Sequence, residues 1–245
     1  MQTLENELSA AQEEIRRLKD AADKQRDVFR SVYPATSAIP SIILTGPSDF
    51  QVHHSYITRT ILGKDKDGSS AWSSVFLADI FTNGVISVEV TLLSVDYNCG
   101  GVNIGLMDYS SPLPEVGQPL GDEVENSVNL NVNGHLTIGI PLMFASGPCH
   151  SELKEGDCVR MEVDLDSTPR TVRFFVNGET VERYISGIHS SVRIKFSLFG
   201  EGTSIRIDNI SRLPRPTPLS EGMREYSIQQ QKIRLQLGLV PNPFP

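Results

Sequence analysis

The amino-acid sequence predicts an all-β fold in which two antiparallel sheets are stacked as a sandwich. Apolar and polar residues alternate through residues 159–165, 172–176 and 192–198, which is typical of strands with one buried face. Asn-Gly dipeptides, which accept the positive φ angles of two-residue hairpin turns, stand at positions 83–84, 133–134 and 177–178. Because the three alternating runs share an apolar face, a second sheet is needed to cover that face.

An N-terminal helix precedes the predicted sandwich. Residues 1–32 carry apolar side chains at alternating spacings of four and three, the repeat of a coiled coil. We expect self-association through this helix, with the core positions Leu4, Leu8, Ile15, Leu18 and Phe29. Two alternatives stay open: a lone charged helix that packs on the sandwich, and the end of a longer coiled coil.

Residues 33–41 contain two prolines without periodicity and are predicted to be a linker. The sandwich is predicted to occupy residues 42–211. Its further strands are expected at 42–44, within 50–62, at 71–78, 86–92, 102–106, 128–132 and 136–140, with a long loop at 108–125.

The C-terminal segment, residues 212–245, begins with a proline-rich linker. Beyond it, a helix over 220–237 is predicted, with Ser220 as its cap and apolar residues at heptad-like spacing. A competing alternation of period two runs from Ile233 to Leu239 and would favour a strand instead.

One ordered series of residues resembles a known family. It consists of Gly156-Asp157, Asp164-Leu165, residues 174–178 (Phe-Phe-Val-Asn-Gly), Gly187-Ile188 and Ser197-Leu198. This series is similar to the C-terminal half of a SPRY domain, and weaker similarity extends back towards residue 40. The resemblance implies a concanavalin-like jelly roll, PRY–SPRY-like in kind, that serves as a non-enzymatic protein-recognition module or adaptor.

A coiled coil followed by a SPRY domain also resembles the back half of tripartite-motif ubiquitin ligases. This sequence, however, has no cysteine clusters of the RING or B-box type, so a ligase is not predicted. Two alternatives to protein recognition stay open. One is a lectin-like carbohydrate-binding sandwich, and the other is a structural oligomer that the sandwich merely decorates.

Composition and charge narrow the possible partners and compartment. The formal net charge is −8, and residues 33–211 hold 11 basic against 21 acidic side chains, which argues against nucleic-acid binding and favours a basic or neutral ligand. Three cysteines without framework spacing favour a reducing compartment. With no apolar leader and no membrane-spanning run, we expect a cytoplasmic protein without membrane contact.

Motifs of catalysis and metal binding are missing. The sequence has no Gly-x-Ser-x-Gly elbow and no phosphate-binding loop, and Asp65-Lys66-Asp67-Gly68 fits a hairpin turn better than a calcium loop. Adjacent histidines His53-His54 would point to opposite faces of a strand, and Cys149-His150 with Cys158 lacks zinc-ligand spacing. We therefore expect no enzymatic activity, no metal and no cofactor.

Loops at one edge of the sandwich are the expected binding surface, since loops carry function on a rigid scaffold. By rough correspondence with SPRY relatives, this edge draws on Tyr97, Asn98, Asp108, Tyr109, Phe199 and Glu201. The two tyrosines are the expected anchors, because aromatic side chains on loops are typical hot spots. The alternative is that either tyrosine merely covers the rim of the sandwich.

Overall fold

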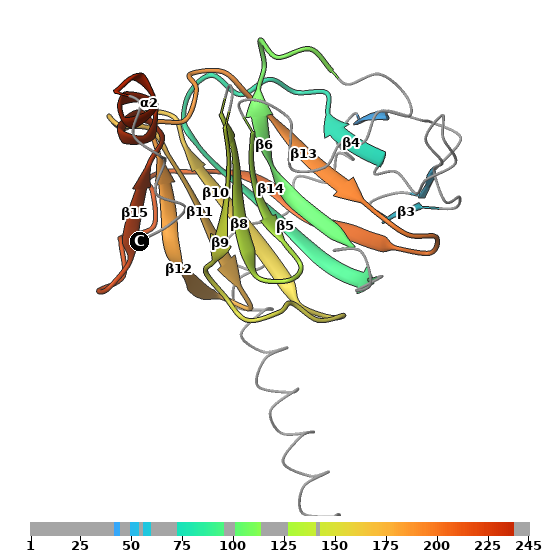
Figure 1. Cartoon of the computed structure of the whole chain (residues 1–245). Coiled ribbons are helices and arrows are strands. Elements are labelled where there is room, and N and C mark those ends of the chain that lie inside the picture. The colour runs from blue at the N-terminus through green and yellow to red at the C-terminus, as the bar shows by residue number, and fades with distance from the viewer. Residues whose placement is uncertain are drawn as a thin grey trace, which may run out of the picture. The chain divides into compact units, whose positions relative to one another are not determined.

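The computed structural model describes residues 42–44, 50–53, 56–59, 73–95, 101–113, 127–140 and 143–237. Within these residues the chain forms two sheets (Figure 1). The seven-stranded sheet has the order β1 (Ile42–Leu44), β4 (Ser73–Leu77), β13 (Val192–Leu198), β6 (Val102–Asp108), β7 (Ser127–Asn131), β8 (His135–Ile140) and β9 (Met143–Pro148). The eight-stranded sheet has the order β15 (Arg224–Ser227), β12 (Glu179–Ser186), β11 (Thr171–Val176), β10 (Cys158–Asp164), β5 (Val85–Ser94), β14 (Ser204–Leu213), β3 (Tyr56–Arg59) and β2 (Phe50–His53).

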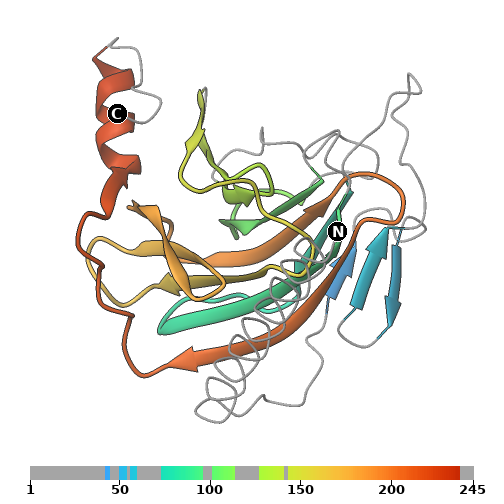
Figure 2. The ribbon, with the colours of Figure 1, turned by 90° about the horizontal axis from the view of Figure 1, so that it is seen from below.

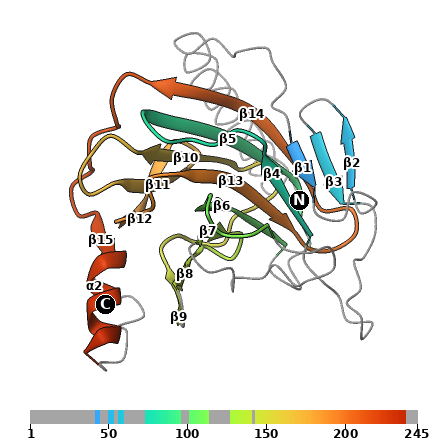
Figure 3. The same ribbon diagram turned by 90° about the horizontal axis from the view of Figure 1, so that it is seen from above.

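A single apolar core lies between the two sheets, which Figure 3 shows as two layers. Ile104 and Phe196 enter this core from the seven-stranded sheet, and Val88, Met161 and Phe174 enter it from the eight-stranded sheet. Each of these five side chains is at most 1% exposed. The predicted fold class, a two-sheet β-sandwich, is confirmed.

The strand at residues 192–198 has a different neighbour from the one that the sequence suggested. We grouped it with 159–165 and 172–176 as three strands with a common face. β10 and β11 do pair with each other, but β13 lies in the opposite sheet, between β4 and β6. All three strands still point their apolar residues into the same core, because alternation identifies a buried face without identifying the strand's partners.

Two of the three Asn-Gly dipeptides form hairpin turns, at 133–134 between β7 and β8 and at 177–178 between β11 and β12. Asn83-Gly84 lies instead between β4 and β5, which belong to different sheets. Asn177 and Gly178 adopt φ angles of 52° and 89° between β11 and β12, as a two-residue hairpin turn requires. The Asn177 side chain accepts a hydrogen bond from the Cys158 backbone N–H (3.0 Å) and donates one to Asp157 Oδ1 (2.8 Å). The turn therefore also fixes the start of β10, which links two parts of the SPRY-like series.

β9 was not predicted from the sequence. Its residues, Met-Phe-Ala-Ser-Gly-Pro, lack alternation and end in a proline, which cannot donate a hydrogen bond to a neighbouring strand. Among the residues that the structure describes, β9 pairs with β8 alone and lies at the end of its sheet, where proline is tolerated.

The C-terminal segment belongs to the sandwich, in contrast to the predicted linker and tail. β14 continues to Leu213, past the predicted boundary at 211, and β15 pairs in parallel with β12. The helix, α2 (Ile228–Gln236), lies inside the predicted range 220–237 but begins at Ile228, where the Ser227 hydroxyl accepts a hydrogen bond from the Gln230 N–H (3.4 Å). Pairing with β12 and burial of Tyr226 hold the residues before it in a strand.

Several predictions concern residues outside the described ranges. They include the coiled-coil positions Leu4, Leu8, Ile15, Leu18 and Phe29, the linker over 33–41, and the loop residues Tyr97 and Asn98. Self-association through the N-terminal helix therefore stays a prediction. In the ranges that the structure does describe, no helix has the length and apolar character needed to cross a bilayer.

Candidate functional site

Three loops of the sandwich meet at the edge where β6 ends and β13 begins. Val192, the first residue of β13, pairs with Asp108 on one side and with Phe81 on the other. The N–H of Tyr109 donates to the carbonyl of Ser191 (3.0 Å), which joins the loop after β6 to the loop before β13. We call the surface formed by Ile80, Asp108, Tyr109, His189 and Arg193 the Asp108 edge.

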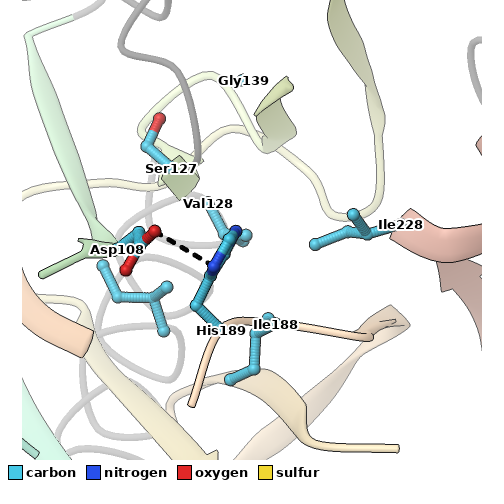
Figure 4. A pocket seen from close by; sticks show the side chains of 8 residues that line it. Asp108, Ser127, Val128, Gly139, Ile188, His189 and Ile228 are labelled. Atoms are coloured by element: carbon cyan, nitrogen blue, oxygen red, sulfur yellow. Dashed lines mark ion pairs between the residues drawn. The ribbon is translucent and has the colours of Figure 1, made fainter. Parts of the chain in front are cut away.

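The carboxylate of Asp108 connects two of these loops, the one after β6 and the one before β13. His189 Nδ1 lies 3.0 Å from Asp108 Oδ2 (Figure 4), and Ser110 donates from its backbone N–H to Oδ1 (3.1 Å) and from its hydroxyl to Oδ2 (2.6 Å). Asp108 is only 7% exposed, so these three partners are needed to satisfy its oxygens. Since the carboxylate accepts, Nδ1 of His189 is the protonated ring nitrogen.

The surroundings of His189 disfavour its charged form. Burial lowers the pKa of His189 below its ordinary value, the Asp108 carboxylate raises it in part, and the positive charge of Lys232 on α2 lowers it further. The imidazole is therefore neutral at neutral pH and acts as a hydrogen-bond donor to Asp108.

A small cavity lies beside this pair, lined by β6, β7 and β8 of the seven-stranded sheet, by the loop before β13 and by the first residue of α2. Its volume is about 10 Å³, close to the space that one water molecule occupies. Its lining consists of Leu106 and of the seven residues labelled in Figure 4: Asp108, Ser127, Val128, Gly139, Ile188, His189 and Ile228. Ser127 shares this lining with an Asp–His pair, but it is fully buried and accepts a hydrogen bond from Asn129 (3.5 Å), so a substrate could not reach its hydroxyl. The arrangement positions loops and does not form a catalytic triad.

The outer part of the Asp108 edge exposes two large apolar side chains. Tyr109 is 45% exposed and Ile80 is 40% exposed. The guanidinium carbon of Arg193, which is itself nearly buried, lies 5.1 Å from the centre of the Tyr109 ring. This cation–π contact restrains the aromatic ring while leaving part of its surface open to solvent.

The structure brings Asp108 and Tyr109 together but places Phe199 and Glu201 elsewhere. β6 and β13 are antiparallel, so Asp108 lies opposite Val192, whereas Leu198 lies opposite Val102. Phe199 and Glu201 are therefore at the other end of the sheet, about 20 Å away at the usual rise of a strand. The prediction that all six residues share one edge is wrong for these two, because residue numbers alone do not say which strand ends coincide.

Phe199 also differs from an exposed contact residue. It is 7% exposed, its N–H donates to the carbonyl of Gly101 (2.7 Å), and its carbonyl accepts from the Thr203 hydroxyl (2.5 Å). These bonds make it a structural residue of the opposite end, while Glu201 is exposed there.

His189, Arg193 and Ile80 were not singled out from the sequence. His189 directly follows Gly187-Ile188, which belongs to the SPRY-like series, and Arg193 is an outward position of an alternating strand. Neither feature distinguishes these residues from other polar residues until the pairing of β6 with β13 is known.

A second hollow of about 400 Å³ lies near the end of β9, beside β12 and β15. Its lining includes Cys149, His150, Glu182, Arg183 and Arg224, with Arg224 Nη2 3.0 Å from Glu182 Oε2. Burial raises the pKa of the Cys149 thiol to about 12, and this thiol donates to the carbonyl of Gly134 (3.4 Å). A thiol that stays protonated is a poor metal ligand, and no cluster of three potential metal ligands occurs among the residues described.

Comparison with known proteins adds a fold-level likeness only. No family model matches the chain, and no curated protein matches it. Among solved structures it is similar to the SPRY domain of human HERC1, with 14% identity over 69% of this chain and 98% of that chain and a TM-score of 0.47. It is also similar to the TRIM65 PSpry domain, with 15% identity over 65% of this chain and 83% of that chain and a TM-score of 0.45. A third is peanut lectin in complex with a 9mer peptide, with 19% identity over 70% of this chain and 90% of that chain and a TM-score of 0.46.

Proposed function

We propose that this chain is a non-enzymatic recognition module that binds a peptide or a protein surface through the Asp108 edge. The observation that carries the proposal is the presence of two exposed apolar side chains on restrained loops. Tyr109 follows the buried Asp108 carboxylate, which Ser110 and His189 hold, and Ile80 precedes Phe81, which pairs with Val192. An aromatic residue on a fixed loop is the kind of anchor that dominates binding energy at protein interfaces.

The edge is organised before any ligand arrives. The backbone of Tyr109 is fixed by its bond to Ser191, its ring is restrained by Arg193, and the preceding residue is held by His189 and Ser110. Preorganisation of this kind lowers the conformational entropy that binding would otherwise cost.

The chemistry of the ligand follows from two charge considerations. The acidic domain as a whole favours a basic or neutral ligand. At the Asp108 edge, however, Arg193 beside Tyr109 and Lys232 near His189 would repel a strongly basic segment. A neutral peptide segment with an apolar anchor residue is compatible with the acidic domain and with the local cations. We propose this as the ligand class.

A peptide-display selection against the full chain tests the proposal. Selected peptides are then titrated against the unmodified chain, Tyr109→Ala and a matched control, Glu201→Ala, at the opposite end of the sheet. Tyr109→Ala is expected to weaken binding by about tenfold or more, equal to about 1.4 kcal/mol, while Glu201→Ala changes it less than about twofold. Peptides that bind Tyr109→Ala as tightly as the unmodified chain would remove the Asp108 edge as the binding surface.

The lectin-like alternative would use the outer face of the seven-stranded sheet, which carries asparagine and threonine side chains. Asn129 and Thr137 on this face are 0% and 2% exposed, so these polar groups do not reach solvent where a sugar could contact them. We therefore favour protein recognition. A glycan array run beside the peptide selection separates the two, because glycan binding without peptide binding would reverse this preference.

We further propose that the N-terminal helix assembles the chain into oligomers, which would raise its avidity for a multivalent partner. The repeat over residues 1–32 supports this. Light scattering on the full chain and on residues 34–245 provides the test. The full chain is expected to contain more protomers per particle, and equal numbers would exclude assembly through the helix.

A further inference from the structure

The segment between β14 and β15, residues 214–223, forms neither helix nor strand. Figures 2 and 3 show it leaving the end of β14 and passing around the outside of the eight-stranded sheet to reach β15. It contacts the outward-facing side chains of β10 and β11, which alternate with the core residues of these strands. We call this segment the strap.

Thr217 holds the strap to the sheet through four hydrogen bonds. Its backbone N–H donates to Glu162 Oε1 (2.9 Å) and its hydroxyl donates to Glu162 Oε2 (2.6 Å). Its carbonyl accepts from Arg173 Nη1, and its hydroxyl oxygen accepts from Arg160 Nη1 (3.5 Å). Both oxygens of the Glu162 carboxylate are thus bound to a single residue of the strap.

The carboxylate that Thr217 binds is buried and has its own counter-ions. Glu162 is 1% exposed, and its charge is balanced by Arg160 Nη1 at 3.0 Å from Oε2 and by Arg173 Nη1 at 3.7 Å from Oε1. Arg160 is fixed in addition by lying 3.5 Å over the ring of Phe175. Removing either arginine from Glu162 would leave a buried charge uncompensated, which is strongly unfavourable.

We propose that Thr217 is a phosphorylation site and that phosphate on this residue releases the strap. Thr217 stands between Pro216 and Pro218 and is only half-buried, and its neighbours Arg215 and Leu219 are exposed. A threonine followed by proline in an extended segment is the substrate of proline-directed protein kinases. The γ-phosphoryl group of ATP is transferred to Oγ1 of Thr217; the bond to the β-phosphate oxygen breaks to give ADP, and the hydroxyl proton leaves to the base of the kinase.

The effect of this modification follows from the site. Phosphorylation removes the hydroxyl proton that now binds Glu162 and places a charge of about −1.5 to −2 beside the buried carboxylate. Arg160 Nη1 lies 3.5 Å from Thr217 Oγ1 and 3.0 Å from Glu162 Oε2, so the phosphate and the carboxylate would compete for it. The two positive charges of Arg160 and Arg173 are too few to balance both the buried carboxylate and a phosphate. The strap therefore detaches, while β15 stays in place because Tyr226 is buried in the core. This inference does not depend on the Asp108 edge.

Hydrogen exchange on the full chain with phosphothreonine encoded at position 217 tests the release. Amides of the strap are expected to exchange at least tenfold faster than in the unmodified chain, with β15 as an unchanged internal reference. Thr217→Val, which loses the hydroxyl but adds no charge, is expected to accelerate exchange much less. Glu162→Gln removes the carboxylate that would repel the phosphate. In this variant we expect phosphothreonine at position 217 not to accelerate amide exchange in the strap.

Two results would overturn the inference about release: strap exchange that phosphate does not accelerate, and equal acceleration by phosphothreonine and by Thr217→Val. A second assay tests the site itself. A purified proline-directed kinase with ATP is expected to modify Thr217 in the folded chain, located by mass spectrometry, and to leave Thr217→Ala unmodified at that position. Absence of phosphate on Thr217 in the folded chain would refute the assignment.

Discussion

Replacing Asp108 by alanine tests whether one buried carboxylate holds the Asp108 edge together. Asp108→Ala removes the acceptor of three hydrogen bonds, two from Ser110 and one from His189 Nδ1. Ser110 is exposed, so water replaces its partner at little cost. The His189 N–H is only partly exposed, and leaving it without an acceptor costs about 1–2 kcal/mol. The unpaired His189 N–H and the space left by the missing side chain both destabilise the variant. We expect the free energy of unfolding to fall by about 2–3 kcal/mol in total.

Asp108→Asn is the matched control for this loss. The asparagine Oδ1 still accepts from the Ser110 N–H, and its amide can donate to a neutral His189 that has moved its proton to the other ring nitrogen. We expect the free energy of unfolding to fall by only about 1 kcal/mol.

Urea unfolding of the full chain measures both variants, with an unchanged m-value as the sign that the folded state keeps its compactness. If Asp108→Ala lowers the free energy of unfolding by less than about 0.5 kcal/mol, the Asp108 carboxylate does not hold the edge together. This role would be refuted equally by an asparagine variant as unstable as the alanine variant, since the hydrogen bonds would then not be the cause.

Three further predictions concern stability, pH and thiol chemistry. Gly105→Ala places a Cβ 2.9 Å from Asn129 Cα and closer still to the Val128 carbonyl oxygen, so we expect it to lower the free energy of unfolding in urea by more than about 3 kcal/mol. Gly178→Ala, at φ +89° with open space around the new Cβ, should lower it by only about 1–2 kcal/mol. A larger loss in Gly178→Ala than in Gly105→Ala would contradict the packing of β6 on β7. Because the pKa of His189 is lower in the folded than in the unfolded chain, the unfolded chain binds more protons, and stability should fall as the pH drops below about 6.5, by at most about 1.4 kcal/mol per pH unit. His189→Asn, which cannot titrate, should lose this contribution, and an unchanged pH profile of urea unfolding would argue against it. Since its pKa is about 12, the buried Cys149 thiol should react with iodoacetamide at pH 8 far more slowly than the partly exposed Cys158, as measured by peptide mass spectrometry; comparable rates would contradict the burial of Cys149.

Local sequence patterns were sufficient to predict strands, turns and the class of the fold. Alternation located β5, β6, β10, β11 and β13, and the Asn-Gly dipeptides located the turns at 133–134 and 177–178, because both signals depend on neighbouring residues alone. The same signals failed for β9, where proline and glycine interrupt the pattern, and for β15, where pairing with β12 overrides the tendency to form a helix.

The candidate site was only partly predictable, for a geometric reason. Tyr109 could be singled out as an aromatic residue at the start of a loop, but its partners Arg193 and His189 are set by the register of β6 against β13. The same register separates Phe199 from Asp108. A residue's position in the sequence does not contain this information when the strands that pair are many residues apart.

Tyr109 is far along the chain from His189 and Arg193, and this separation determines the stage of synthesis and folding at which the Asp108 edge forms. During synthesis, Tyr109 leaves the ribosome long before His189 and Arg193 have been made. Until β13 inserts between β4 and β6, Tyr109 lacks its contacts with Ser191 and Arg193. The chain between Tyr109 and these residues closes into a loop only when that insertion takes place. A ligand that recognises the restrained tyrosine will therefore distinguish finished, correctly folded molecules from nascent or truncated ones.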